Sequence, residues 1–173
     1  QLATLPLQGI CPGGQPIMSY NFGAGNKERV KKAFFTQFKV CTIFTSCFWL
    51  IMLLFPKLFA GIFSNNTDLI TYTAWALRIY MAGIFSLGFQ GSCQQSFMAL
   101  GQAKVSLLLA CLRKLILLIP LIFILPLFIQ DKVFAVFLAE PISDIVAATI
   151  TTITFMSRFN GILNKGSKMK TAE

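Results

Sequence analysis

Five stretches of this sequence are apolar over about the 20 residues that a helix needs to cross the hydrocarbon of a membrane. They cover residues 2–24, 38–63, 74–100, 105–129 and 133–155. The polar connections between them are short, so neighbouring helices must run antiparallel and successive connections must lie on alternate sides. The pattern predicts an all-α polytopic bundle of about five transmembrane helices over residues 1–157 and a polar, basic tail over residues 158–173.

The first stretch differs from the others because it is partly polar and rich in helix breakers. Pro6, Pro12 and Pro16 interrupt it, and Gly13 and Gly14 lie between them. Backbone carbonyls freed by such breaks are tolerated in a membrane only beside protein or a water-filled cavity. Two interpretations stay open, namely a broken helix that lines a transport pathway and a helix whose glycines and prolines shape its packing.

The distribution of positive charge supports the alternation. The chain carries a formal net charge of +9, although only 12% of its residues are charged. One side of the predicted bundle receives Lys27, Arg29, Lys31, Lys32, Lys39, Lys104, Arg158, Lys165, Lys168 and Lys170, and the other receives Lys57, Arg78 and Lys132. Lysine and arginine accumulate on the cytoplasmic side of membrane proteins. We therefore expect a multi-pass protein of the cell membrane with a cytoplasmic C-terminus and no nucleic-acid partner.

The residue types in the sequence give little support for a catalytic site or a metal site. The sequence has no histidine, which excludes imidazole bases and histidine zinc ligands. Its five cysteines form no closely spaced pair and lie in apolar stretches, as small buried side chains do. We predict that the protein is not an enzyme and holds no metal or organic cofactor.

Polar side chains inside the apolar stretches are the best candidates for a substrate site, because they are costly there. The third stretch carries Ser86, Gln90, Gln94 and Met98 at a spacing of four, which is one face of a helix. An amide row beside methionine would suit a large amphipathic small molecule. The alternative is that the glutamines only bond neighbouring helices, at under about 1 kcal/mol each. At the end of the first stretch, Tyr20 and Asn21 are further candidates for substrate contacts.

Charged residues also fall within the predicted spans. Glu140 and Asp144 lie four apart on one face, and such acids can exchange protons or hold a cation, so they are candidates for ion coupling. Alternatively, Glu140 pairs with Arg78. Arg113 and Lys114 lie roughly 15 Å into the fourth stretch at 1.5 Å per residue. We favour snorkelling to the interface or a structural role for them, and the alternative is that Arg113 faces the bundle and pairs with carbonyls or an acid.

One segment resembles a known family. Residues 14–30 resemble the G-x-P-x-x-S-Y-N-x-G-A-x-N-x-x-R-V motif of multidrug and toxic compound extrusion (MATE) transporters. Weaker matches follow in order at residues 97–101, 112–114 with Pro120, and 139–144. The resemblance implies a transporter with two lobes of six helices, of which this chain would supply helices eight to twelve. The missing N-terminal lobe of the same protein would then be its partner, besides the lipid bilayer and the small-molecule substrate.

The resemblance also implies an activity, which is export of amphipathic or cationic organic compounds in antiport with Na⁺ or H⁺ by alternating access. Some family members place an acid on helix ten, whereas residues 74–100 contain none, so no coupling site is carried over. Two alternatives remain. A flippase of lipid-linked oligosaccharides from the same superfamily would be favoured by an inward-facing Arg113, and a non-transporting membrane scaffold would lack a polar cavity.

Overall fold

The computed structural model describes residues 4–63 and 65–170, with side chains as far as Asn164. Over these residues the chain forms helices and connections, with no strand. The predicted all-α bundle is therefore confirmed. The helical elements, in order, are α1 (Leu5–Gly23), α2 (Lys27–Leu54), α3 (Pro56–Phe63), α4 (Thr67–Tyr80), the 3₁₀-helix η1 (Met81–Ser86), α5 (Leu87–Ala99), α6 (Ala103–Cys111), the π-helix η2 (Leu112–Leu118), α7 (Ile119–Phe128) and α8 (Lys132–Lys170).

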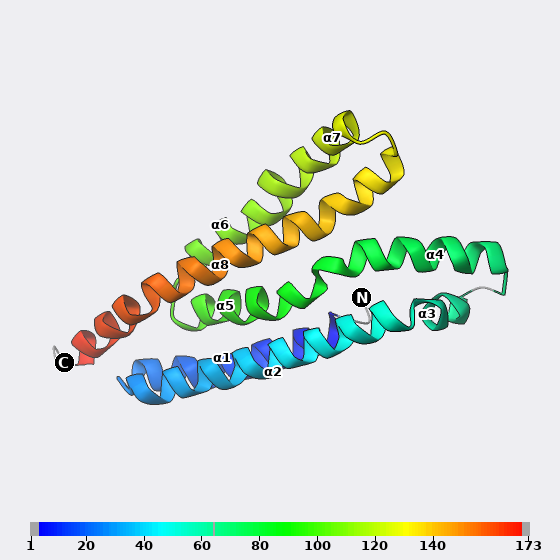
Figure 1. Ribbon diagram of the computed structural model, residues 1–173. Helices are drawn as coiled ribbons and strands as arrows, with labels where there is room; N and C mark the ends of the chain where they lie inside the picture. The colour runs from blue at the N-terminus through cyan, green and yellow to red at the C-terminus, as the bar shows by residue number, and fades with distance from the viewer. Residues whose placement is uncertain (1–3, 64, 171–173) are drawn as a thin grey trace.

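The long elements lie side by side as antiparallel neighbours (Figure 1). α1 and α2 form one hairpin, the segment from α4 to α5 packs against it, and α6 to α7 folds back along α8. The α1–α2 turn, the α5–α6 turn and the end of α8 all lie at the same end of the molecule (Figure 1). This arrangement gathers the lysine-rich and arginine-rich segments at one end, as alternation of the connections requires.

Several helix boundaries differ from the predicted ones. α2 begins at Lys27 rather than near residue 38, and it ends where Phe55 leaves helical geometry (φ −123°, ψ 47°) before Pro56. A residue before proline avoids the helical region, so the second stretch is divided into α2 and α3. α8 continues as helix to Lys170, into the predicted tail. The side chains of Lys165, Lys168 and Lys170, and residues 171–173 altogether, lie outside the described residues.

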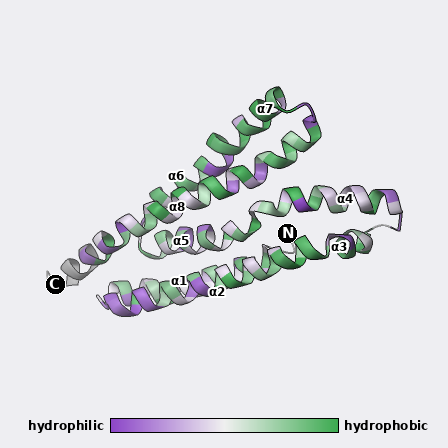
Figure 2. Ribbon diagram, viewed as in Figure 1, coloured by the Kyte–Doolittle hydropathy of each residue, from purple (hydrophilic) through white to green (hydrophobic). Residues whose placement is uncertain are grey.

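Within the part of the chain that the structure describes, three helical segments are long and apolar enough to cross a membrane, namely Lys27–Leu54, Ala103–Phe128 and Lys132–Asn164. The segment from α4 to α5 is divided by η1 into shorter helices, so it falls outside this set together with α1. Large apolar side chains cover much of the outer surface, and Leu127 and Phe128 are each 81% exposed. Figure 2 shows α7 largely in the hydrophobic colour, as expected of a surface that faces lipid.

An aromatic cluster forms the core at the end of the bundle that contains the α1–α2 turn. Phe34, Phe97, Phe155 and Phe159 are buried, and their neighbouring ring centroids lie between 4.6 and 5.1 Å apart. These rings join α2, α5 and α8. Ser19 adds α1 to this core, because its Oγ donates a hydrogen bond of 2.9 Å to the carbonyl oxygen of Ala99. The serine of the family-like motif thus has a structural contact.

Glycine allows the middle of the bundle to pack closely. A Cβ atom on Gly83 would lie 2.7 Å from the Cα of Pro141 on α8, and one on Gly88 would lie 2.7 Å from the carbonyl oxygen of Cys41 on α2. Neither distance is compatible with a side chain. Small residues at such crossings let helices in a membrane approach each other closely, so α5 and η1 are held between α2 and α8.

Candidate functional site

The four polar positions of the third stretch do not share one cavity. Ser86 is buried in η1, where its Oγ donates a hydrogen bond of 2.7 Å to the carbonyl oxygen of Gly83. Gln90 is buried, Gln94 is half-buried, and Met98 is 45% exposed. The 3₁₀-helix has fewer residues per turn than the α-helix, so the spacing of four describes one face only from Leu87 onward.

Gln90 and Gln94 line an open cavity of about 200 Å³ between α1, α5 and η2, which we call the amide cavity. Its lining residues are Thr4, Leu7, Gln8, Cys11, Leu87, Gln90, Gly91, Gln94, Gln95 and Arg113. Gln90 is 3% exposed, and its Oε1 atom has no hydrogen-bond partner among the described residues. The thiol of the lining residue Cys11 lies 3.3 Å from the thiol of Cys41 on α2, and both cysteines are free. The amide cavity thus offers the neutral amides of Gln8, Gln90, Gln94 and Gln95 beside the charged side chain of Arg113.

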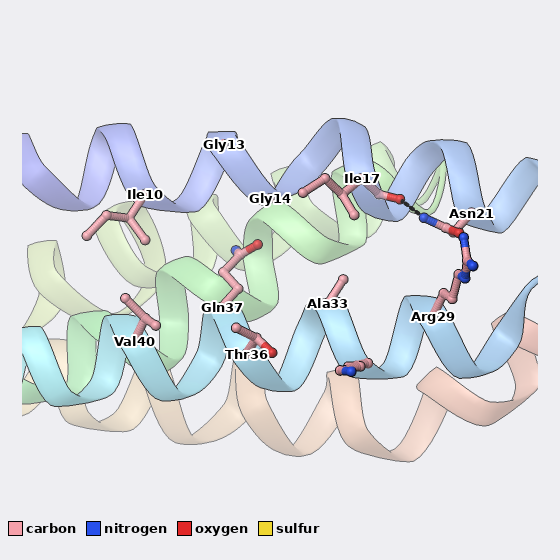
Figure 3. A pocket seen from close by; sticks show the side chains of 11 residues that line it. Ile10, Gly13, Gly14, Ile17, Asn21, Arg29, Ala33, Thr36, Gln37 and Val40 are labelled. Atoms are coloured by element: carbon pink, nitrogen blue, oxygen red, sulfur yellow. Dashed lines mark hydrogen bonds between the residues drawn. The ribbon is translucent and has the colours of Figure 1, made fainter.

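A second cavity, of about 590 Å³, lies between α1 and α2 (Figure 3), and we call it the basic groove. Asn21 lines it and is 8% exposed; its Nδ2 donates a hydrogen bond of 2.8 Å to the carbonyl oxygen of Ile17, and its Oδ1 has no partner among the described residues. Arg29 and Lys32 also line the groove. Tyr20 is 77% exposed and is not among its lining residues. The structure therefore separates Tyr20 and Asn21 from Gln90 and Gln94.

Gln37 is a site residue that the sequence interpretation missed. It lines the basic groove from α2, is 6% exposed, and has neither amide atom paired among the described residues. Its side chain lies against Gly14, where a Cβ atom would collide with it (Figure 3). The sequence does contain a pattern that would have predicted its burial. Buried positions of α2 recur at helical spacing, and they are Val30, Phe34, Gln37, Cys41 and Thr45. It was overlooked because the predicted span began at residue 38.

The charged residues within the bundle form two ion pairs between η2 and α8. Arg113 donates a hydrogen bond of 2.7 Å from Nε to Oδ1 of Asp144, and its Nη2 lies 2.6 Å from the same oxygen. Lys114 Nζ lies 3.0 Å from Oε1 of Glu140. Arg113 therefore faces the bundle and pairs with an acid, which was the alternative to snorkelling. Likewise, Glu140 pairs with Lys114 and not with Arg78.

The backbone of η2 is irregular at the residues that form these ion pairs, and it also contacts α8 directly. A π-helix places its hydrogen bonds one residue further along the chain and often occurs at functional positions. Pro120 follows directly in α7 and has no N–H to donate to the preceding turn. Ser143 of α8 donates a hydrogen bond of 3.0 Å to the carbonyl oxygen of Arg113. Both the side chain and the backbone of Arg113 are therefore bound by α8.

A comparison with known proteins identifies the family. The family model described as MatE matches residues 1–124 of this chain. The chain belongs to the MatE family. This membership confirms the resemblance of residues 14–30.

Individual relatives agree with this assignment. The multidrug export protein MepA of Staphylococcus saprophyticus is 26% identical over 153 residues, which are 87% of this chain and 33% of MepA. A multidrug resistance MATE family transporter in an inward-facing conformation superposes with a TM-score of 0.85 at 18% identity, covering 93% of this chain and 37% of that one. A MATE structure in the bent conformation gives a TM-score of 0.88 at 19% identity, covering 96% and 36%. The chain spans about a third of the length of these relatives, and the structural likeness establishes the fold.

Proposed function

We propose that the protein to which this chain belongs is a secondary active transporter. It exports small amphipathic or cationic organic compounds in antiport with Na⁺ or H⁺ by alternating access. The chain supplies most of one lobe, and the remaining lobe of the same protein is its partner. The multidrug export function named for MepA and the MatE family membership support this proposal.

The amide cavity is the observation that carries the proposal. Unpartnered polar atoms in a bundle interior are rare unless a ligand or water binds them. Gln90 presents such an atom, and Gln94 and Gln95 add amides to the same wall. Amides within an apolar surround suit an amphipathic molecule, since they orient it without demanding a fixed charge. A packed scaffold protein would have no use for this cavity.

Efflux of a fluorescent cationic dye by the full-length transporter in everted vesicles tests this role. We expect Gln90→Leu and Gln94→Leu to reduce the initial rate of dye transport on the order of tenfold, because each change removes a polar contact from the cavity. Gln130→Leu is the matched control, since this glutamine is exposed in the α7–α8 connection. Transport at the unchanged rate in both cavity variants, with normal expression, would remove α5 from the pathway.

For ion coupling we propose Glu140 and Asp144, with Glu140 as the more exchangeable of the two. Its partner Lys114 is 54% exposed and can move into water, whereas Asp144 is held by two nitrogen atoms of Arg113. An arriving cation would take the place of the ammonium group. Glu140→Gln should then weaken the dependence of efflux on the Na⁺ or H⁺ gradient, and Lys114→Gln should shift it toward lower ion concentration.

A flippase for lipid-linked oligosaccharides is the second candidate, because Arg113 lines the amide cavity. A guanidinium there is suited to a pyrophosphate group. Asp144 already pairs with it, however, so the cavity receives little net positive charge from this pair. Translocation of a lipid-linked sugar by reconstituted protein that fails to move the dye would favour the flippase.

A further inference from the structure

The basic groove changes polarity along its length. Asn21 and Arg29 line one end, and Ile10 and Val40 line the other (Figure 3); Lys32, one turn after Arg29 on α2, also lines the groove. Its volume of about 590 Å³ lies within the range of sites that hold small organic ligands, roughly 300–1,000 Å³. All its lining residues come from α1 and α2, and none of them is acidic. The groove therefore has one end suited to an anion and one end suited to a hydrocarbon chain.

The polar end lies at the height of the lipid headgroups. α2 has 28 residues and is thus about 42 Å long at 1.5 Å per residue, whereas the hydrocarbon of a bilayer is only about 30 Å thick. Arg29 and Lys32 occupy its first two turns. Val40 lies roughly 12 Å further along the helix axis than Lys32, within the hydrocarbon. This order of groups matches the order along a membrane lipid, from headgroup to acyl chain.

Unpaired amides point to a ligand in the same groove. Asn21 and Gln37 are both more than nine-tenths buried, and Oδ1 of Asn21 and both amide atoms of Gln37 lack partners among the described residues. Buried polar atoms without partners call for an explanation by a bound ligand, water or ion. Ester oxygens of a glycerolipid would supply an acceptor for Nε2 of Gln37, and water held beside the lipid headgroup would supply donors for the amide oxygens.

We propose that the basic groove binds one anionic phospholipid of the surrounding membrane. Its phosphate lies at Arg29 and Lys32, its glycerol region at Asn21 and Gln37, and an acyl chain along the apolar wall. Basic pockets between transmembrane helices bind anionic lipid headgroups in this way. A cationic compound would be repelled by the two basic side chains, and a free phosphate ion would leave the apolar wall without a contact.

Lipid retention by the full-length transporter tests the site directly. The protein is reconstituted in nanodiscs of phosphatidylcholine with a small fraction of phosphatidylglycerol, extracted in mild detergent, and analysed for tightly retained lipid by native mass spectrometry. We expect one phosphatidylglycerol per transporter to be retained in preference to phosphatidylcholine. Because the readout is bound lipid, it is independent of whether the protein transports the dye.

Two pairs of matched variants separate the headgroup from the chain. Arg29→Gln with Lys32→Gln removes two charges from the groove, and Lys31→Gln with Lys39→Gln removes two exposed charges from the same helix outside it. Gly13→Leu fills the groove, and Gly9→Leu adds the same side chain outside it; a Cβ atom at either glycine meets nothing within 4 Å. The groove charge variant should lose the preference for phosphatidylglycerol on the order of tenfold. Gly13→Leu should lose both lipids, and both controls should behave as the wild type.

Three results would overturn the proposal. The first is equal retention of phosphatidylglycerol and phosphatidylcholine by the wild type. The second is displacement of the lipid by glycerol phosphate as readily as by phosphatidylglycerol, which would make the groove a site for free anions. The third is no retained lipid at all in a correctly folded protein, which would mean that another segment of the parent transporter closes the groove.

Discussion

The two halves of the bundle hold polar groups in different ways. Between α1, α2 and α5 the interior polar groups are neutral amides and hydroxyls, and the amides of Asn21, Gln37 and Gln90 each leave an atom without a partner among the described residues. Between η2 and α8 four polar groups are charged, and they pair with each other as Arg113 with Asp144 and Lys114 with Glu140. The unpaired atoms border cavities, whereas the paired groups join two helices.

This difference separates binding from structure. A buried charge without a partner is so unfavourable that the chain must satisfy it internally. Leaving a neutral amide unpaired costs less free energy than leaving a charge unpaired, so an amide can stay unbonded in the protein without its ligand. The α1–α2–α5 half is therefore where an organic ligand is expected, whereas the paired charges of the η2–α8 half set helix positions and are the proposed site of ion coupling. Three substitutions test this contrast.

Asp144→Ala should have the largest effect. It leaves Arg113 charged and unpaired inside the bundle, so we expect a loss of about 3 kcal/mol in stability. The midpoint of thermal unfolding of the full-length transporter in detergent measures this loss. Replacing Arg113 and Asp144 together by leucine should recover most of it, because no lone charge remains. A single variant that unfolds like the wild type would show that the ion pair does not join η2 to α8.

Gly83→Ala should destabilise the packing of η1 against α8 by about 1–3 kcal/mol, because the added methyl group overpacks the crossing. Its new Cβ atom would lie 2.7 Å from the Cα of Pro141, and backbone on both sides prevents relief. Gly61→Ala in α3 serves as the control, since a Cβ atom there meets nothing within 4 Å. Thermal unfolding again provides the measurement. Equal midpoints for the two variants would contradict the close crossing of η1 and α8.

Gln37→Leu should have the smallest effect and the opposite sign. It removes two unpaired buried polar atoms at similar volume, so stability should stay constant or rise by up to about 1 kcal/mol. Thr45→Val, in the same buried stripe of α2, is the control. The hydroxyl of Thr45 donates within 3.1 Å to the carbonyl oxygens of Cys41 and Phe85, so its loss should destabilise. Marked destabilisation by Gln37→Leu would show that this amide has a structural partner.

The sequence predicted site residues correctly only where they lie on one helix, because their spacing along the chain then fixes which face of the helix they share. Gln90 and Gln94 both lie on α5 and face one cavity, as their spacing of four requires. Ser86 and Met98 are not among the lining residues of that cavity: the hydroxyl of Ser86 is bonded to the carbonyl oxygen of Gly83, and Met98 is 45% exposed. The basic groove escaped prediction because its two walls, α1 and α2, contribute residues whose proximity depends on how the hairpin packs.

By itself, the sequence determined the helical class, the approximate helices, the family motif and the charge bias of the connections. These depend on apolar run length and on residue type, which act locally. Only the tertiary structure decided that Arg113 pairs with Asp144, that Gly83 lies against Pro141, and that Asn21 and Gln90 belong to different cavities. Such contacts join residues that are distant in the chain, and they depend on how helices rotate and cross, which an apolar membrane-spanning sequence leaves open because most of its faces are alike.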